Sequence, residues 1–402
     1  MKLLLVVDDL QATSLDEPGL WLTDLATRWP QRGHRVEVVC VQAAAPPIDP
    51  PDGVVVHAPG PDGFENALGA CLESRPDVVH VASRGPLGPR VVEILRDLPV
   101  LLDIHDFWPI CPAGDLMRRP RLLPCGEHYP FHGCGACAGL ARLRAMEERS
   151  QVVAAAGVLL AHSVFNRVRL NAGLGRAVEL IDYGVDTSRY CPDPDPPWQP
   201  QIMEMFASRE RPRAIFLGPP TAARGGERVI DLLVALRARL PDIEMVVAGR
   251  DPDNPDWDRV IGVEVKELGL ERNIRLLPSV PLRDLPALYA SCQVAFSPLL
   301  GSEPGGLFVE HALACGLPIV ANPHGAIQDL VQDGREGIFV SSRETAAFAD
   351  ALCALLMDPN ARVCFGEAAR LKAVESHDVQ RSLFQLEELH HRIRENGRRA
   401  AA

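Results

Sequence analysis

Short apolar, β-branched runs alternate with helical patterns from one end of the chain to the other. Amphipathic stretches such as 20–29, 229–240 and 285–290 predict helices. Strands that are apolar throughout and alternate with helices are typical of parallel sheets covered on both faces. The apolar runs predict strands at 3–7, 36–41, 54–57, 78–81 and 100–104, and a second series at 214–217, 243–248, 274–277, 294–297 and 318–321.

A proline-rich segment, CPDPDPPWQP, separates the two series of strands. Proline at this density cannot continue a helix or a central strand, so we interpret 191–212 as a linker between domains. The prediction is an α/β protein with two doubly wound, Rossmann-like domains at 1–190 and 213–380. A ligand is expected in the cleft between them, at the carboxyl ends of the strands. The last stretch, 381–402, predicts a polar helix that packs back across the first domain.

Composition narrows the class of protein. The chain has 402 residues, of which 47% are hydrophobic, enough for a full core. A net charge of −12 argues against a nucleic-acid binder that works by bulk electrostatics. The start, MKLLLVVDD, predicts a buried strand rather than a signal peptide, and no run approaches the roughly 20 apolar residues of a membrane helix. We therefore expect a cytoplasmic protein whose eleven cysteines are reduced or bind metal.

The segment 301–316, GSEPGGLFVEHALACG, predicts an anion site. Its apolar part predicts a helix over 306–315, which Gly316 terminates. Gly305 and Gly306 then stand at the helix N-terminus, where backbone N–H groups and the helix dipole favour a phosphate. Glycines at such a junction are also common as simple turn residues.

Three ionisable side chains flank this junction. Glu303 precedes the glycines, and Glu310 and His311 are adjacent on the predicted helix. Neighbouring residues of an ideal helix point about 100° apart. Only one of the two can therefore face a ligand beside Glu303, and the other must pack or meet solvent.

These features resemble the hallmark region of the retaining GT-B glycosyltransferases of the family 4 type. That family, which is glycogen synthase-like, has two glutamates at E-x7-E before an ACG-x-P-V-V-A sequence. Counted back from ACG, Glu303 matches the first and His311 the second, so this chain reads E-x7-H. The resemblance implies a GT-B fold of two Rossmann-like domains that face a central cleft. It extends along most of the chain, including GLWLTDLATRWPQRGHRVEVV (19–39), ELIDYGVDTSRYCP (179–192) and FLGPPTAARGGERVIDLL (216–233).

The resemblance implies roles for residues on the donor side. Glu303 would contact hydroxyls of the donor sugar as a catalytic residue. The backbone N–H groups of Gly306 and Leu307 would hold the distal phosphate, with Gly305 beside them. The expected ligand is therefore a nucleotide diphosphate sugar.

Two of the family's four donor contacts are altered in this sequence, those at Pro219 and His311. Arg224, followed by Gly225, takes the place of the diphosphate-binding lysine, and Pro219 stands where the motif has an arginine. His311 replaces the ribose-binding glutamate. A neutral imidazole can bond one ribose hydroxyl but cannot act as a bidentate anion. Packing within the helix is the alternative role for His311.

The resemblance also marks two residues of the N-terminal domain. Gly19 opens the first helix in a loop where the family usually has two glycines, and it would let the backbone approach the diphosphate and acceptor. His105, at the strand end in the sequence DIHD, matches a histidine that reaches the transferred sugar or phosphate. Asp106 would orient it. The alternative is a strand-end histidine bonded to a backbone carbonyl.

A cysteine-rich segment, CPAGDLMRRPRLLPCGEHYPFHGCGAC, follows this strand end. The spacing Cys134-x-x-Cys137 is that of a zinc knuckle, and two further thiolates would complete a tetrahedron. Family members with HD[YFW]…CP at this point often carry such a cluster. We expect structural zinc ahead of an iron–sulfur cluster, with four incidental thiols as the alternative. The segment holds four cysteines and two histidines: Cys111, Cys125, Cys134, Cys137, His128 and His132.

Three arginines in the same segment, Arg118, Arg119 and Arg121, suit an anionic partner. They would grip a phosphate-bearing acceptor or make peripheral contact with an anionic membrane surface at its inner face. A solvated loop face is the alternative.

We expect an enzyme that moves a sugar from a nucleotide diphosphate donor to a glycan, lipid-linked or secondary-metabolite acceptor, as in polysaccharide biosynthesis. No metal is expected in the chemistry, because helix N-terminal amides and Arg224 would neutralise the leaving diphosphate. One alternative is a non-catalytic GT-B subunit in which Pro219 and His311 reflect a decayed donor site. Another is a nucleotide-sugar epimerase, which would offer more acids and histidines near the sugar.

Overall fold

The structure is a computed structural model, and two compact units divide the chain. The first unit comprises Met1–Pro120, Cys125–Asp182 and Ser382–Ala402, and the second comprises Arg121–Pro124 and Tyr183–Arg381. The residues that the structure describes are 1–8, 17–41, 52–57, 63–82, 87, 89–96, 98–118, 123–126, 133–196, 198–251, 254, 256–278, 280–341 and 343–401.

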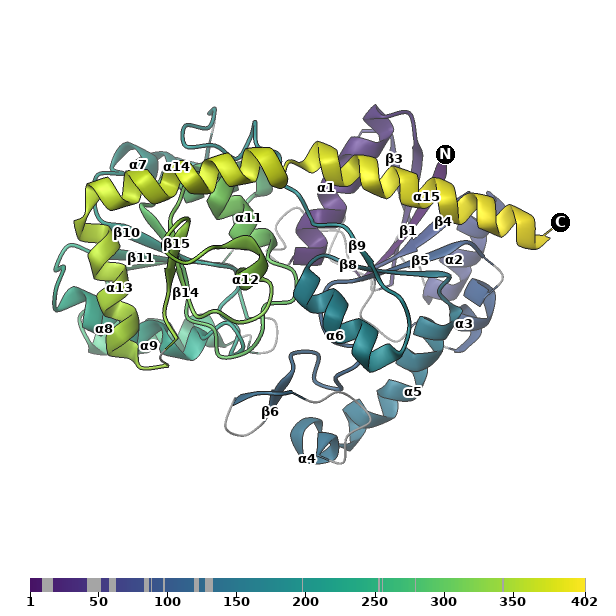
Figure 1. Ribbon diagram of the computed structural model, residues 1–402, viewed down its shortest axis with the longest axis horizontal. Coiled ribbons are helices and arrows are strands. Elements are labelled where there is room, and N and C mark those ends of the chain that lie inside the picture. Colours follow the sequence, from purple (N-terminus) through teal and green to yellow (C-terminus); the bar gives the residue numbers. More distant parts are fainter. Residues whose placement is uncertain are drawn as a thin grey trace. The chain divides into compact units, whose positions relative to one another are not determined.

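The first unit is built on a parallel sheet of seven strands (Figure 1). All five strands predicted for this part of the chain are present, and two further short strands extend the sheet. In spatial order the strands are β3 (Val54–His57), β2 (Arg35–Cys40), β1 (Lys2–Val7), β4 (Val78–Val81), β5 (Val100–Ile104), β8 (Val158–Ala161) and β9 (Glu179–Leu180). The helices are α1 (Glu17–Gln31), α2 (Gly63–Glu73), α3 (Pro89–Arg96), α4 (Cys134–Ala138), α5 (Leu140–Ala155), α6 (Val164–Leu174) and most of α15 (Val379–Ala401). Two short strands, β6 (Met117–Arg118) and β7 (Leu123–Pro124), form a separate sheet.

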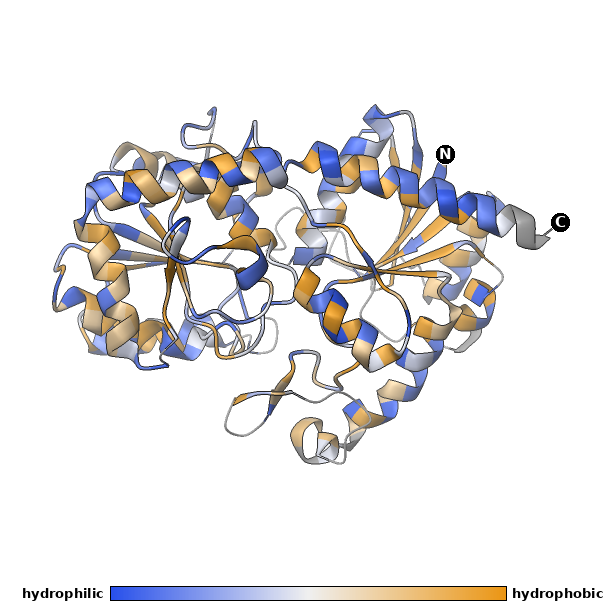
Figure 2. Ribbon diagram, in the orientation of Figure 1, coloured by the Kyte–Doolittle hydropathy of each residue, from blue (hydrophilic) through white to orange (hydrophobic). Residues whose placement is uncertain are grey.

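The central strands of this sheet are buried along their whole length. Each residue from Leu3 to Val7 in β1 is at most 1% exposed. Because successive strand residues point to opposite faces, this burial requires cover on both faces. Figure 2 shows the same pattern, with hydrophobic strands inside each unit and hydrophilic residues on the outer helix surfaces.

The last helix, α15, packs on the first unit. Glu387 accepts two hydrogen bonds from Arg32, at 2.5 and 2.8 Å, and lies 3.1 Å from His34. One turn later, the His390 ring meets the Trp29 ring edge-on, with centroids 5.2 Å apart. The inward face of α15 therefore contacts the first unit through Glu387 and His390, while most of its other polar residues face outward. These contacts explain why a highly charged helix packs here.

The second unit is built on a parallel sheet of six strands. Five of them match predicted strands, and β15 is the addition. In spatial order they are β12 (Ile274–Leu277), β11 (Glu244–Ala248), β10 (Arg213–Phe216), β13 (Val294–Ser297), β14 (Ile319–Ala321) and β15 (Gly337–Phe339). The helices are α7 (Pro200–Ala207), α8 (Val229–Arg237), α9 (Trp257–Glu267), α10 (Leu285–Ala290), α11 (Leu307–Ala314), α12 (Ile327–Leu330), α13 (Thr345–Met357) and α14 (Pro359–Ser376), with 3-10 turns at Gly226–Arg228 and Leu282–Asp284.

Both sheets have the same topology. Numbered along the chain within each unit, the strands lie in the order 3-2-1-4-5-6, with β9 added at the edge of the first sheet. This is the Rossmann order, and its direction reverses between strands 1 and 4. In the second unit that reversal lies between β10 and β13, so the loops that follow these two strands are the expected ligand site.

The proline-rich segment interpreted as a linker belongs to the second unit. Chain contacts change units at Asp182–Tyr183, rather than at 190. Helix α7 begins at Pro200, because the first helical turn does not need the missing N–H. Trp198 also packs against Phe206, with ring centroids 4.7 Å apart. In the part of the chain that the structure describes, no helix combines the length and apolar character needed to cross a membrane.

Candidate active site

The loops after β10 and β13 bring Arg224 and Glu303 together. The guanidinium donates from Nε to Oε2 at 3.0 Å and from Nη2 to Oε1 at 2.8 Å. Glu303 is 5% exposed, and the Arg224 side chain is 15% exposed. The Arg224 guanidinium also lies 5.3 Å from the centroid of the Phe308 ring. A planar, two-bond pair of this kind is strong and directional.

Backbone contacts fix the loop that carries Glu303. The carbonyl of Glu303 accepts from the N–H of Ala326 at 2.8 Å. Gly325 lies directly against the Glu303 backbone with φ +75°, and a Cβ there would collide with it. The N–H groups of Leu300 and Gly301 both donate to the carbonyl beside Arg224, that of Ala223, at 2.9 Å. The acid and the cation are therefore held by rigid loops, and glycine is required at 325.

The N-terminus of α11 follows Glu303 directly. Helix α11 begins at Leu307, and Gly306 is its N-cap with φ +98°, packed so closely on Leu330 that a Cβ would clash. Gly305 is buried in the turn before it. The helix ends as predicted, since the N–H of Gly316 donates to Leu313 and that of Leu317 to Ala312, the paired bonds of a Schellman motif. The backbone amides expected to hold a phosphate thus lie at a true helix start beside Glu303.

Gly225 and Pro219 lie in the loop after β10. Gly225 is packed against the carbonyl of Pro298, which leaves no room for a side chain. Pro219 is buried at the position where the family motif has an arginine. Arg224 is thus the cation that this loop places beside Glu303.

His311 is buried in an aromatic stack. Its ring lies parallel to that of Tyr190, with centroids 4.1 Å apart and an interplanar angle of 4°. Tyr289 meets it edge-on at 5.8 Å. Burial, together with the charge of Arg189, lowers the pKa of His311 to about 3, so the ring is neutral at physiological pH. A neutral ring of this kind can pack against other side chains and can form a single hydrogen bond with a ligand. It cannot form a charged contact.

Glu310 points elsewhere, as the helix geometry requires. It is fully buried, and its Oε1 lies 3.8 Å from Nδ1 of His377 at the end of α14. Burial, together with Lys372 and Arg381, lowers the pKa of His377 to about 4. The contact is therefore not an ion pair at neutral pH. Glu310 belongs to the packing of α11 on α14 and not to the Arg224–Glu303 site.

In the first unit, His105 stands at the end of β5 as predicted and is 3% exposed. Its Nε2 lies 3.4 Å from Oδ2 of Asp103, and its ring stacks on that of His162 at 4.9 Å. Asp106, the residue expected to orient His105, accepts a hydrogen bond at Oδ1 from the N–H of Trp108 at 2.6 Å. The carboxylate beside His105 is that of Asp103.

Gly19 and three arginines of the cysteine-rich segment are further predicted positions in the first part of the chain. Gly19 lies in the first turn of α1, which begins at Glu17, rather than in a loop before the helix. Arg118 is exposed on β6. The predicted positions Arg119 and Arg121 lie outside the described residues.

The four cysteines expected to bind zinc are not gathered into one site. All eleven cysteines are thiols. Cys134 and Cys137 share α4, where Cys137 donates to the carbonyl of Met117 at 3.0 Å, while Cys111 is buried. No three of the four come within ligand distance of one another among the described residues, and His128 and His132 lie outside these residues.

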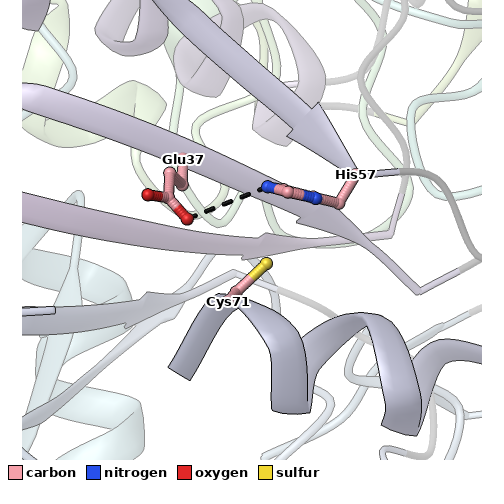
Figure 3. A group of neighbouring side chains, drawn as sticks. All are labelled: Glu37, His57 and Cys71. Atoms are coloured by element: carbon pink, nitrogen blue, oxygen red, sulfur yellow. Dashed lines mark ion pairs between the residues drawn. The ribbon is translucent and has the colours of Figure 1, made fainter. Parts of the chain in front are cut away.

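Two other groups have the residue types of a metal site. The first group consists of Asp103, His105 and His162. In it, Nε2 of His162 and Oδ1 of Asp103 are 2.5 Å apart. That is closer than the separation of about 3 Å between two ligands of one zinc ion, so the contact is a hydrogen bond. Glu37, His57 and Cys71 form the second group (Figure 3), in which the acid and imidazole are 3.8 Å apart.

Electrostatics in the second group oppose a metal ion. Lys2 lies 3.5 Å and Arg35 3.2 Å from Oε1 of Glu37, so two cations already neutralise the acid. Burial, with the charge of Glu37, raises the pKa of Cys71 to about 11, which keeps the thiol protonated. A divalent ion would need the thiolate and would meet both cations.

The sequence patterns did not identify Asp103, His162, Tyr190 and Phe308. Asp103 had a detectable signal, since it is a lone acid inside the apolar strand VLLDI. A charge in a buried strand requires partners, which here come from two neighbouring strands. The other three are apolar or strand-end residues whose role depends on distant contacts.

Known glycosyltransferases resemble this chain along much of its length. A GDP-mannose-dependent α-(1-6)-phosphatidylinositol monomannoside mannosyltransferase from Mycolicibacterium smegmatis is 29% identical over 222 residues, covering 53% of this chain and 56% of that protein. Its counterpart of the same name from Mycobacterium tuberculosis is 25% identical over 339 residues, covering 79% of this chain and 84% of the relative.

Solved structures agree in fold. Sucrose-phosphate synthase from Thermosynechococcus elongatus superimposes with a TM-score of 0.73 at 17% identity, covering 98% of this chain and 99% of that one. Anabaena HepE, solved in complex with UDP and glucose, gives a TM-score of 0.71 at 18% identity, covering 97% and 99%.

Family models cover both units. The model "Glycosyltransferase Family 4" matches residues 20–189, and "Glycosyl transferases group 1" matches residues 201–372. The matched segments include His105 in the first unit and the Arg224–Glu303 pair in the second. Together with the two Rossmann-ordered sheets, these matches lead to one conclusion: the chain is a nucleotide-sugar glycosyltransferase of the GT-B fold and belongs to the family 4 type.

Proposed function

We propose that this protein transfers a hexose, with retention of configuration, from a nucleotide diphosphate sugar bound on the second unit. The observation that carries the proposal is the Arg224–Glu303 pair beside the N-terminus of α11, at the strand-order reversal of the second sheet. Parallel sheets of this topology bind ligands at that point.

Each group at this site has a separate task in the proposal. The N–H groups of Gly306 and Leu307 and the dipole of α11 stabilise the distal phosphate. Glu303 accepts hydrogen bonds from sugar hydroxyls and is held in position by Arg224. When the sugar–phosphate bond breaks, negative charge grows on the diphosphate, and Arg224 offers the compensating cation. His311 contributes one neutral hydrogen bond to the ribose, with Gly225 and Gly305 admitting the backbone close to the ligand.

On the first unit we place the acceptor, with His105 as the catalytic residue near the transferred sugar and Gly19 near the diphosphate. The acceptor class is a glycan, a lipid-linked sugar or a small metabolite. Two relatives are named for a phosphatidylinositol mannoside acceptor and a GDP-mannose donor, which supports including GDP-mannose and inositol lipids in a first panel.

A donor panel tests the proposal directly. The purified chain would be incubated with UDP-, GDP- and ADP-sugars, and nucleoside diphosphate release would be measured with and without acceptors. The expected result is release with one donor class, and anomeric analysis of the product reports retention. No release with any donor, and no thermal shift with UDP, GDP or ADP, would overturn it.

One observation favours a second candidate, a non-catalytic GT-B subunit. Arg224 is engaged by Glu303, and His311 is covered by Tyr190, so both substituted contacts are satisfied within the protein. In that case the donor site would bind no nucleotide, and the protein would act by binding a glycan or a protein partner. Calorimetry against the three diphosphates separates the two candidates.

Zinc and membrane contact are further proposals about the cysteine-rich segment. On the strength of the Cys134-x-x-Cys137 spacing we propose one structural zinc ion held by Cys111, Cys125, Cys134 and Cys137, and its binding would have to bring together cysteines that lie apart here. Peripheral contact of Arg118 and its neighbours with an anionic surface is proposed on the same sequence basis. Neither enters the transfer reaction.

A further inference from the structure

A buried carboxylate in the first unit is surrounded by imidazoles. Asp103, 1% exposed on β5, has its Oδ2 at 2.9 Å from Nε2 of His80 on β4. Its Oδ1 lies 2.5 Å from Nε2 of His162, which follows β8, and its Oδ2 lies 3.4 Å from Nε2 of His105. β4, β5 and β8 are adjacent strands of the first sheet (Figure 1). His80 on β4, His105 just after β5 and His162 just after β8 all approach the Asp103 carboxylate.

His162 faces an acceptor at each ring nitrogen. Nε2 meets the Asp103 carboxylate at 2.5 Å, and Nδ1 lies 2.8 Å from the carbonyl oxygen of Ile181. A carbonyl oxygen and an ionised carboxylate can only accept. Both nitrogens must therefore carry a proton, which makes the ring an imidazolium.

The carboxylate is the matching anion. Burial raises the pKa of Asp103, but hydrogen bonds from the neighbouring His105 and His162 and the positive charge of His162 outweigh this effect, and the pKa lies well below its usual value. A buried acid and a buried imidazolium at this distance give a neutral pair. A second protonated ring in the same site would leave an uncompensated buried charge.

His105 is the ring most affected by this pair. It stacks on His162 with centroids 4.9 Å apart and an interplanar angle of 20°. A positive charge so close disfavours protonation of His105. Asp103 at 3.4 Å favours the tautomer with its proton on Nε2, because that nitrogen faces the carboxylate.

We infer that Asp103 and His162 are positioning residues: a permanent buried ion pair that keeps His105 neutral, with the proton on Nε2. Because its Nε2–H faces Asp103, a neutral His105 can accept a hydrogen bond from a sugar hydroxyl at Nδ1 but cannot donate one there to a phosphate oxygen. The catalytic part of this inference rests on the proposed function; the charge state of His162 does not.

His80 and His390 also lie at this cluster. His80 is fully buried on β4, and His390 of α15 stacks edge-on to it with centroids 5.5 Å apart. Burial puts the pKa of His390 well below its usual value, so that ring is neutral. Helix α1 contributes the indole of Trp21, edge-on to His162 at 5.6 Å.

Nuclear magnetic resonance of the full chain, labelled with ¹⁵N at histidine, tests the charge state without any assay of activity. Among the twelve histidines, we expect one ring with both nitrogens protonated at pH 8.5. The signal should vanish in His162→Gln and persist in the control His390→Phe. A wild-type spectrum in which every histidine is neutral at pH 8.5 would overturn the inference, whether or not the protein proves to be an enzyme.

The pH dependence of turnover tests the positioning role. Wild-type kcat should be flat from pH 6 to 8.5. In His162→Gln the positive charge beside His105 is lost, protonation of His105 becomes easier, and an acidic limb should appear in kcat while the donor KM stays within about twofold. Asp103→Asn should lower kcat about tenfold, with partial rescue by Asp103→Glu. A flat profile in His162→Gln would contradict the positioning role.

Discussion

Arg224 holds Glu303 through two hydrogen bonds, so the cation and the acid expected to serve one donor molecule are bound to each other. A lysine at this position, as in the family motif, would offer a point charge and a single direction. The arginine fork fixes the plane of the carboxylate. Donor binding at this site therefore has to share or replace contacts that already exist.

Replacement of Glu303 tests the donor site. Glu303→Ala removes the acid proposed to contact the sugar, and we expect turnover to fall at least tenfold, about 1.4 kcal/mol in the barrier. Asp350→Ala serves as a control, because it removes the acid of an exposed pair with Arg239. Circular dichroism would confirm folding, and steady-state kinetics with a verified donor would measure the change. Equal kinetics for wild type and Glu303→Ala would refute the assignment.

Restoring the family residue tests the role of His311. His311→Glu places a carboxylate where the native ring is 5% exposed and stacked on Tyr190, so the free protein should have a lower melting temperature. A bound ribose offers that carboxylate two hydroxyl donors, so the thermal shift with nucleoside diphosphate should exceed that of wild type.

The matched control for this substitution is His311→Gln, which keeps a polar group without the charge. It should lose the stacking and gain no affinity. If His311→Glu and His311→Gln bind each nucleoside diphosphate with equally low affinity, His311 is only a packing residue.

Stability should depend on pH through buried neutral histidines. The pKa of His311 is about 3 and that of His377 about 4, both lowered first by burial, against 6.5 in the unfolded chain. Between pH 6.5 and 4 the unfolded state therefore binds protons that the folded state does not. The free energy of unfolding should therefore decrease as the pH is lowered through this window, by about 1.4 kcal/mol per pH unit for each such group.

Denaturant unfolding from pH 7.5 to 4.5 measures this slope. His390→Phe removes a third buried histidine whose pKa is also lowered, so the slope should decrease. The adjacent, exposed His391 is the control, and His391→Gln should leave the slope unchanged. A slope that is the same in all three proteins would refute the linkage.

Zinc content tests the cysteine-rich segment. Elemental analysis of protein purified without a histidine tag should find about one zinc per chain, and Cys134→Ser and Cys137→Ser should each lose it. Cys364→Ser, at an exposed cysteine of α14, is the control and should retain the metal. Protein free of both zinc and iron would remove the metal hypothesis.

The strands of both sheets could be predicted because a buried parallel strand needs an unbroken apolar run. Three strands of these sheets were not predicted: β8, although its sequence VLLA is an apolar run, and the short edge strands β9 and β15, which lack that pattern. The predicted linker at 191–212 contains a helix, α7, that the proline content did not suggest. Proline prevents a helix from continuing, but at Pro200 it occupies the first turn, where the missing N–H is no loss.

Patterns along the chain were enough to predict the two Rossmann-like units, the helix start at Gly306 and the places of Glu303, Arg224 and His105 in loops and at a strand end. These follow from local periodicity, glycine placement and motif spacing, all of which act over short stretches of chain. The fold was needed to learn which side chains meet: Arg224 with Glu303 across two loops, His311 with Tyr190, and Asp103 with histidines from neighbouring strands. Such pairings depend on strand order and on the burial of charge, and a linear sequence carries neither.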